Sequence, residues 1–391
     1  MAERKPGTAT ALTWSGVIAR RMARHALAEP VADLGPDGIA RVLCGAHAQL
    51  LGAAELSIGR RIAGATRADV RRALWEERTL VKTFGPRGTI HLLPAADLPM
   101  WTGALSALPP FRQHPEPVRF APGQAEEVIA AIGDALADAE LTVDELTGAI
   151  EARTGPWAVE RTMEAFGGKW PRWRQLTSAA AHRGMLCFGP DRGRNVTYTN
   201  PHRWLPGFRP ADGDAALRAL LTRYLHAYGP ATPANFAQWL AMPARRAAEL
   251  FGALGGELER VELDGTPAWT LAGDTATPPE PHRGIRLLPY FDAYVVAGQP
   301  RQRLYPGAAA GRALTPAGQA GNYPVLLVDG VVGGVWHQRR AGRTTAITVE
   351  PLRELTTLQR RQLDEEVELV GAVMKATMTL TVGAVTVGAH A

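Results

Sequence analysis

The sequence contains little cysteine, little lysine and no long apolar run. Its 391 residues include two cysteines, Cys44 and Cys187, which are too few for a disulfide framework or a tetrahedral thiolate zinc site. No stretch of about eighteen residues is both apolar and uncharged, and the first residues lack the apolar core of a secretory signal. We therefore expect a cytoplasmic protein without a membrane span, a metal or a cofactor.

Several common catalytic signatures are also missing. The chain has no GxxxxGK[ST] phosphate loop, no GxSxG nucleophile turn and no HExxH zinc motif. The glycines of DGVVGGVW, at residues 329–336, lack the strand-to-helix setting of a dinucleotide-binding turn. Nucleotide hydrolysis and hydride transfer are therefore poor explanations of this sequence.

Basic charge is present, and nearly all of it comes from arginine. Of the 43 lysine and arginine residues, 39 are arginine, and the formal net charge is +5. The planar guanidinium group matches phosphates and guanine edges, so this surplus is compatible with a nucleic-acid partner. A genome rich in G and C would produce the same bias, so the positions of the arginines must decide between the two explanations.

The first third of the chain shows helices followed by a hairpin. Helices are expected at residues 36–43, 53–62 and 67–78, and a hairpin around Gly85-Pro86-Arg87-Gly88. Thr66 is placed to cap the last of these helices, with Asp69 as its third residue.

Two later segments repeat this order of elements. In the second, Thr142 and Glu145 form another capping pair, and a glycine-punctuated turn at residues 189–194 joins two strands. In the third, Asp264-Gly265 is the hairpin turn. Three helices followed by a hairpin is the order of a winged helix, and its repetition predicts three tandem winged-helix units.

The character of the chain changes near residue 285, after a proline-rich linker at residues 278–281. The remaining sequence is rich in β-prone runs with glycine turns, and one helix is expected at residues 356–374. We therefore predict an α+β protein with three tandem winged-helix units followed by a C-terminal β-barrel-like domain. The predicted boundaries are residues 12–115, 122–208, 212–275 and 283–391.

A histidine and a glutamine interrupt the first helical segment, in CGAHAQLLGAAELSIGRR at residues 44–61. Neighbours two positions apart point about 200° away from each other on a helix. His47 and Gln49 could therefore share a target only where the backbone is extended or broken. By themselves, such residues more often satisfy exposed backbone groups, so the residue pattern alone leaves a catalytic role open.

Arginines cluster at two expected hairpin tips. They are Arg192 and Arg194 in the second segment and Arg339, Arg340 and Arg343 in HQRRAGRTT of the C-terminal domain. Arginine at a hairpin tip can reach DNA phosphates or a narrow minor groove. Exposed turns are also charged for solubility, but several such tips on one chain favour DNA as the partner.

Four stretches together resemble the AlkZ-like winged-helix DNA glycosylases, a bacterial family that includes the YcaQ type. They are AHAQLLGAAELSIGRR, RTLVKTFGPRGTIHLLPAADL, LLPYFDAYVVAGQPR and VLLVDGVVGGVWHQRR. The resemblance extends from about Trp14 to about Gly371. It implies three tandem winged-helix units and a C-terminal β-domain around a basic cleft for duplex DNA. It also implies removal of alkylated purines and, in some members, unhooking of interstrand crosslinks.

The family's catalytic motif is glutamine, an apolar residue, and then glutamine or aspartate. It matches His47-Ala48-Gln49, with histidine in place of the first glutamine. The resemblance therefore implies that Gln49 and His47 are the catalytic residues. A purine alkylated at N7 or N3 is cationic and needs no general acid to leave, so the motif has to hold a water and stabilise an oxocarbenium-like sugar.

The sequence thus predicts a monomeric, nucleoid-associated DNA glycosylase that acts on duplex DNA. Its expected reaction is monofunctional hydrolysis of the N-glycosidic bond of cationic N7- or N3-alkylated purines, with bulky adducts or interstrand crosslinks as further substrates. The alternative is a non-catalytic winged-helix transcription regulator, which would bind a specific sequence and release no base. General alkylation repair and self-resistance to one bulky genotoxin are both compatible with the sequence.

Overall fold

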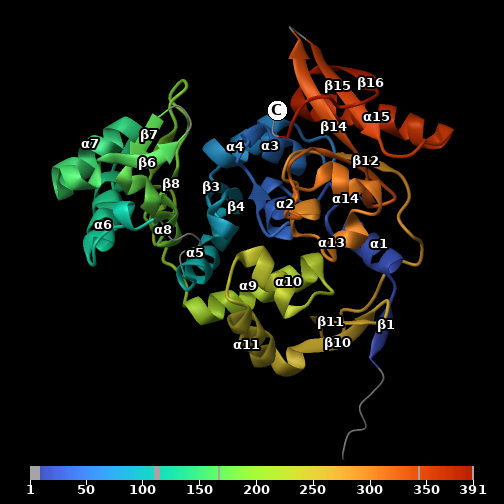
Figure 1. Ribbon diagram of the computed structural model, residues 1–391, viewed down its shortest axis with the longest axis horizontal. Helices are drawn as coiled ribbons and strands as arrows, with labels where there is room; N and C mark the ends of the chain where they lie inside the picture. The colour runs from blue at the N-terminus through green and yellow to red at the C-terminus, as the bar shows by residue number, and fades with distance from the viewer. Residues whose placement is uncertain (1–8, 110–114, 166–167, 342–343, 390–391) are drawn as a thin grey trace, which may run out of the picture. The chain divides into compact units, whose positions relative to one another are not determined.

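The computed structural model describes residues 9–109, 115–165, 168–341 and 344–389 (Figure 1). The chain divides into two compact units. The first, called here the terminal unit, comprises Met1–Arg71, Leu221–Trp239 and Pro243–Ala391. The second, called the central unit, comprises Arg72–Leu220 and Leu240–Met242. Both contain helices and sheets, so the protein is of the mixed α+β class.

The helices and strands are distributed along the whole chain. The α-helices are α1 (Trp14–Arg24), α2 (Pro36–Val42), α3 (Leu51–Gly59), α4 (Arg67–Trp75), α5 (Leu98–Ser106), α6 (Gln124–Leu136), α7 (Val143–Thr154), α8 (Thr177–His182), α9 (Gly213–Tyr228), α10 (Pro233–Leu240), α11 (Ala244–Leu254), α12 (Ala293–Ala297), α13 (Arg301–Leu304), α14 (Ala308–Ala313) and α15 (Thr357–Met374). The strands are β1 (Thr10–Leu12), β2 (Ala46–His47), β3 (Leu80–Phe84), β4 (Ile90–Pro94), β5 (Glu140–Thr142), β6 (Arg161–Ala165), β7 (Gly168–Pro171), β8 (Cys187–Phe188), β9 (Thr197–Thr199), β10 (Leu258–Leu263), β11 (Thr266–Leu271), β12 (Ile285–Leu288), β13 (Val325–Val328), β14 (Val331–Ala341), β15 (Thr344–Pro351) and β16 (Thr377–Val382).

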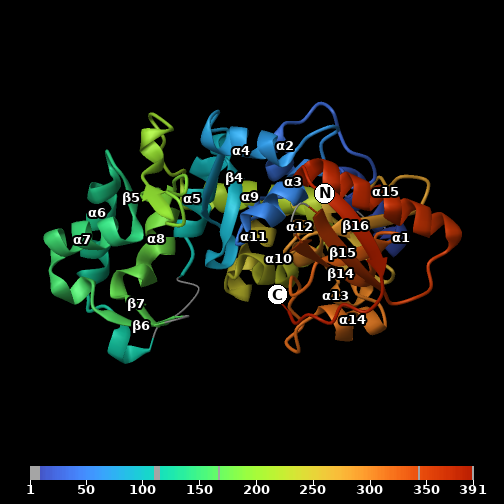
Figure 2. The ribbon, with the colours of Figure 1, turned by 90° about the horizontal axis from the view of Figure 1, so that it is seen from above.

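The central unit is built from α5 to α8 and several short antiparallel strand pairs. Strands β3 and β4 pair from Leu80 opposite Pro94 to Phe84 opposite Ile90, and β5, β9 and β8 form a small sheet in that order. Helices α6 and α7 lie next to each other (Figure 2) and pack around the fully buried Trp173. This apolar packing holds the unit together.

The terminal unit contains a five-stranded sheet whose order follows the chain, β12-β13-β14-β15-β16. Its neighbours are antiparallel except β15 and β16, which are parallel. Helix α15 packs against this sheet through residues such as Leu363, Val367 and Val370, while α1 contributes to a second apolar cluster that includes Val325 and Val335. The sheet is curled like half of a barrel, and among the described residues β12 and β16 are not paired with each other.

Several local expectations are confirmed. Thr142 and Glu145 form a reciprocal capping box at the start of α7, and Thr66 donates its backbone N–H to Asp69 at the start of α4. Asp264 and Gly265 both have positive φ, as a tight two-residue hairpin turn requires. In each case the residues that form the feature are close together in sequence.

One expectation for strand and helix content fails, and one pair of strands was not predicted. Residues 293–297 form helix α12 where a β-prone run was expected, because the Asp292 side chain caps this helix by accepting the Tyr294 N–H. Strands β6 and β7 form a two-stranded ribbon that the sequence did not indicate. Within the described residues, we find no helix with the length and apolarity that a membrane span would need.

We predict that Gly103→Ala destabilises the central unit. A Cβ at residue 103 would lie 2.4 Å from the backbone oxygen of Ala211, which cannot move aside as a side-chain end can. The variant should lower the free energy of unfolding, measured by urea titration, by about 1–3 kcal/mol. The matched control is Gly148→Ala in α7, where a Cβ meets nothing within 4 Å. It should be stabilising by about 0.5–1 kcal/mol, and equal effects of the two variants would contradict the packing described here.

Candidate active site

The His47-Ala48-Gln49 segment lies between α2 and α3. At the end of α2, the N–H of Cys44 donates to the carbonyl of Arg41 and the N–H of Gly45 to that of Ala40. These two hydrogen bonds form a Schellman motif, with Cys44 at the left-handed position (φ 51°). The motif stops the helix and releases the chain into the extended residues Ala46 and His47.

The break after α2 places His47 at the end of a short extended segment and Gln49 in the bend that follows it. His47 is half-buried, Gln49 is exposed, and Ala48 between them is buried with 1% of its surface accessible. Side chains two positions apart share a face in extended chain, whereas a continued helix would have separated them. The expectation of a strand-like break at this point is therefore confirmed.

The ring of His47 stacks on the ring of Phe291. Their centroids are 4.7 Å apart and the ring planes differ by 22°. Phe291 lies in the loop that joins β12 to α12, and its backbone φ is 58°, a value that bulky residues rarely adopt. The motif therefore meets a residue from the C-terminal part of the chain that has an unusual backbone conformation.

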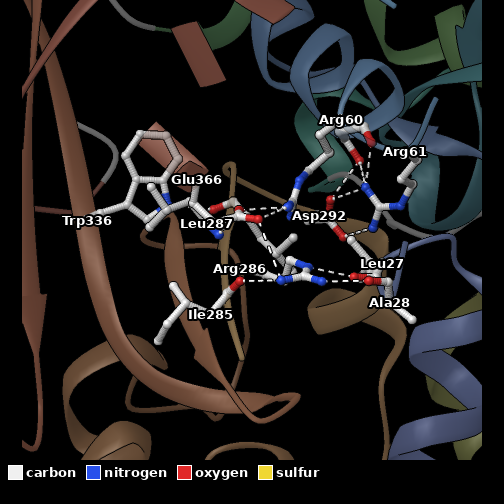
Figure 3. Close-up of polar contacts among 12 residues, drawn as sticks. Leu27, Ala28, Arg60, Arg61, Ile285, Arg286, Leu287, Asp292, Trp336 and Glu366 are labelled. Carbon is white, nitrogen blue, oxygen red and sulfur yellow. Dashed lines mark hydrogen bonds and ion pairs between the residues drawn. The ribbon is translucent and has the colours of Figure 1, made fainter. Parts of the chain in front are cut away.

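Helix α3, which begins two residues after Gln49, is anchored to the same loop by a buried ion pair (Figure 3). Arg61 Nη2 is 2.8 Å from Asp292 Oδ1, and both side chains are fully buried. Ser57 donates its hydroxyl to the same carboxylate at 2.7 Å. Burial alone would raise the pKa of Asp292, but Arg61 and these hydrogen bonds act more strongly together and lower it. Asp292 is thus held as a carboxylate.

A second buried ion pair joins the end of α3 to α15. Arg60 Nη2 lies 2.7 Å from Glu366 Oε2, and Glu366 also accepts the backbone N–H of Leu287 at 2.9 Å (Figure 3). Arg286 contributes a more distant contact to Glu366, 3.7 Å, and donates to the carbonyls of Leu27 and Ala28. Because Glu366 touches α3, β12 and its own helix, it fixes the position of the sheet relative to α3.

The middle of α3 is held by a third buried carboxylate. The Glu55 side chain is fully buried and forms ion pairs with Arg67 and Arg71 of α4. Removing one partner of a buried pair leaves an uncompensated charge, so each pair strongly disfavours other packings even where its net stabilisation is small. One such site within α3 and two directly after it give the His47-Gln49 segment a fixed orientation.

The described arginines among those expected at hairpin tips lie on the surface, and they differ in the contacts that they make within the protein. Arg192 is bound within the protein, 3.1 Å from Glu145, and donates to the carbonyl of Glu140. Arg194 is exposed in the same turn. Arg339 and Arg340 are exposed near the end of β14, opposite Ala346 and Thr345 of β15. Arg343 lies outside the described residues.

Comparison with known proteins agrees with these observations. A sequence model of the family described as DNA glycosylase AlkZ-like matches residues 40–373. A protein of Streptomyces sahachiroi named "Interstrand DNA cross-link repair glycosylase" is 31% identical over 338 residues, which cover 83% of this chain and 87% of the relative. The solved structure of the Streptomyces sahachiroi DNA glycosylase AlkZ matches with a TM-score of 0.80 and 27% identity, covering 96% of this chain and all of that one.

The fold and these matches define the class of protein as a DNA glycosylase. The chain belongs to the AlkZ-like DNA glycosylase family. Its substrate is accordingly DNA and its role is DNA repair, and the alternative of a non-catalytic transcription regulator is set aside.

Sequence reasoning missed the residues that support the motif. Phe291 and Asp292 are more than two hundred positions from His47, and no local pattern connects them. One signal was available, because Glu55, Arg60 and Arg61 are charged residues in and directly after an otherwise apolar helix. Such residues are almost never buried unless paired, so they predict buried partners elsewhere in the chain.

We predict that Asp292→Asn destabilises the terminal unit and changes its response to acid. The substitution leaves the Arg61 charge buried without its counterion, which should lower the free energy of unfolding at neutral pH by about 3–5 kcal/mol. The folded-state pKa of Asp292 lies below its usual 3.8, so its contribution is present above that pH and is lost as the pH falls through the folded-state value. Wild type should therefore lose more stability than the variant below about pH 4.

The control for this prediction is Glu354→Gln at an exposed ion pair of the same unit. Glu354 and Arg360 are 3.6 Å apart with side chains 91% and 57% exposed, so the substitution should change stability little. Urea titrations of the three proteins at several pH values make the comparison. Parallel pH curves for wild type and Asp292→Asn would show that Asp292 does not contribute as described.

Proposed function

We propose that this protein is a monofunctional DNA glycosylase that hydrolyses the N-glycosidic bond of purines alkylated at N7 or N3 in duplex DNA. One observation carries the proposal: His47 and Gln49 reach the surface from a broken helix end whose orientation is fixed by buried ion pairs. Two neutral polar groups in a rigid setting suit a reaction whose leaving group is already activated.

The leaving group explains why no strong acid is needed. Hydrolysis forms a bond between a water oxygen and the sugar C1′ and breaks the bond from C1′ to the purine nitrogen. Alkylation gives the purine a positive charge, so it departs with the bonding electrons as a neutral base and needs no added proton. The enzyme has to hold the water and stabilise the positive charge that develops on the sugar.

His47 and Gln49 have different roles in this reaction. The carboxamide oxygen of Gln49 accepts a hydrogen bond from the water and presents its dipole to the oxocarbenium-like sugar. The unprotonated nitrogen of a neutral imidazole can accept a proton, so we assign His47 as the general base that takes the water proton. Neither residue forms a covalent bond to the sugar, so the product is an abasic site.

The DNA-binding part of the proposal rests on architecture and on arginine placement. Three tandem winged-helix units at residues 12–115, 122–208 and 212–275 would be followed by the β-domain at 283–391. In support, α9, α10 and α11 are followed by the antiparallel hairpin of β10 and β11. The protein would bind duplex DNA as a monomer at the nucleoid in the cytoplasm. The proposed DNA contacts are Arg192, Arg194, Arg339, Arg340 and Arg343.

Bulky lesions belong to the proposed substrate range. The Streptomyces sahachiroi relative is named for interstrand crosslink repair, and the exposure of Gln49 places one motif residue where a large adduct would not have to enter a deep pocket. An unmodified purine is a poor leaving group, so selectivity for damage comes partly from the lesion's own reactivity.

We predict that His47→Ala and Gln49→Ala each lower base release from a duplex containing N7-methylguanine by about 100-fold, the size of a general-base contribution. A single-turnover time course with alkali cleavage of the abasic sites measures the rate. The matched control is Gln302→Ala, which removes an exposed glutamine on α13 of the same unit and should leave the rate unchanged.

The possible outcomes distinguish an error in the roles of His47 and Gln49 from an error in the proposed substrate class. Wild-type rates in both motif variants, with unchanged folding by circular dichroism, would remove His47 and Gln49 from catalysis. No release by wild type from N7-methylguanine or from duplexes carrying bulky N7 adducts would contradict the proposed substrate class.

We also predict that replacing Arg339 and Arg340 together with alanine weakens DNA binding. The slope of log Kd against log salt should fall in magnitude by about 0.9 for each phosphate that these arginines neutralise in the wild-type complex. The variant should weaken binding to all duplex sequences alike, because interactions with phosphates carry no sequence information. Arg361→Ala, at an exposed position of α15, is the control and should keep the wild-type slope. An unchanged slope in the double variant would exclude these two arginines from the interface.

A further inference from the structure

We infer that Phe291 is a positioning residue that holds the His47 ring in its catalytic orientation. The inference rests on the proposed function, because it concerns how His47 performs its part of that reaction. It adds a residue outside the His47-Ala48-Gln49 motif and gives a reason for its unusual backbone conformation.

The stacked geometry restricts the motion of His47. With ring centroids 4.7 Å apart and planes within 22° of parallel, the face of the imidazole rests on the face of the phenyl ring. Small rotations about the histidine χ2 angle would tilt the ring and weaken this stacking, so the stacking restrains the ring plane. The Nδ1 atom of His47 is itself buried. Because His47 is half-buried rather than enclosed, part of its ring stays accessible while its plane is fixed.

The backbone of Phe291 is held in a conformation that a bulky residue does not adopt without support. Its φ of 58° lies in the left-handed region, which costs free energy for a residue with a Cβ. The support comes from the next residue, since Asp292 is fixed by Arg61 and Ser57 and caps α12. The left-handed turn at Phe291 is thus directly followed by a buried, fully bonded anchor.

A glycine provides the space that the Phe291 ring occupies. A Cβ at Gly321 would lie 2.5 Å from Cδ1 of Phe291, so any other residue there would push the ring. Gly321 itself has a φ of 106°, which favours glycine independently. The phenyl ring therefore contacts His47 and is confined by the chain at residue 321.

These contacts connect His47 to both ends of α3. The helix begins just after Gln49 and is followed by Arg61, which binds Asp292, and the preceding residue Phe291 stacks on His47. The helix therefore positions both His47 and the residue that stacks on it. Misplacement of a catalytic group by about 1 Å can lower a rate by about 100-fold, so loss of these contacts should lower the rate of base release.

The test is a double-mutant cycle between positions 291 and 47, measured by single-turnover base release from an N7-methylguanine duplex. Phe291→Leu should lower the rate at least about tenfold with little change in Kd for DNA. The same substitution in the His47→Ala background should change the rate less than about twofold, because its effect acts through His47. Phe291→Tyr, which keeps the ring, should retain most of the activity.

A second variant displaces the Phe291 ring while leaving residue 291 unchanged. Gly321→Ala should lower the rate by pushing Phe291, whereas the control Gly318→Ala also has positive-φ strain (φ 75°) but meets nothing within 4 Å. The control should keep the wild-type rate.

Spectra of protein with isotopically labelled histidine test the stacking without any substrate. The His47 ring protons should be shifted upfield by Phe291 and should move downfield in Phe291→Leu.

Equal rate losses with and without His47, a wild-type rate for Phe291→Leu, or an unshifted His47 signal would each overturn the inference. An inactive wild type with the expected spectra would instead overturn the proposed function and the catalytic part of the inference with it.

Discussion

The buried ion pair between Arg61 and Asp292 is the interaction on which the candidate active site depends. Two charges without access to water are tolerated only when they face each other with good geometry. The pair therefore forms only when α3 and the loop after β12 are both in place. Since the motif precedes α3 and Phe291 precedes Asp292, the pairing of Arg61 with Asp292 also brings Phe291 close to His47.

The same constraint accounts for the arrangement of charge on α3. A helix that is buried on all sides would normally be apolar throughout, yet this one carries Glu55 and is followed by Arg60 and Arg61. Each of the three faces a different partner element: α4, α15 and the β12–α12 loop. Apolar packing alone tolerates small rotations of a helix, whereas two buried ion pairs and a buried carboxylate, each with a partner in a different direction, oppose them.

Local features of the fold were predictable from sequence, and long-range ones were not. The capping pair Thr142 and Glu145 and the turn at Asp264 depend on neighbouring residues, so their patterns are visible in the chain. The break at His47 was visible for the same reason. Helix α12 was missed because β-prone residues outweighed one aspartate cap, and Phe291 because its partner is contributed by a distant segment. Stacking and ion pairing across such separations leave no periodic signal.

The supporting residues also explain how a histidine fits the first position of the family motif. In the proposed reaction the base is cationic, so the enzyme would need a well-placed acceptor for a water rather than a strong acid. An imidazole supplies that acceptor at its edge and a flat apolar face for packing, and Phe291 is placed against that face. A glutamine side chain has more rotatable bonds and offers a smaller flat surface to the same phenyl ring. The histidine and the strained phenylalanine are thus parts of one arrangement, in which the cost of the left-handed backbone at Phe291 is offset by its anchored neighbour Asp292.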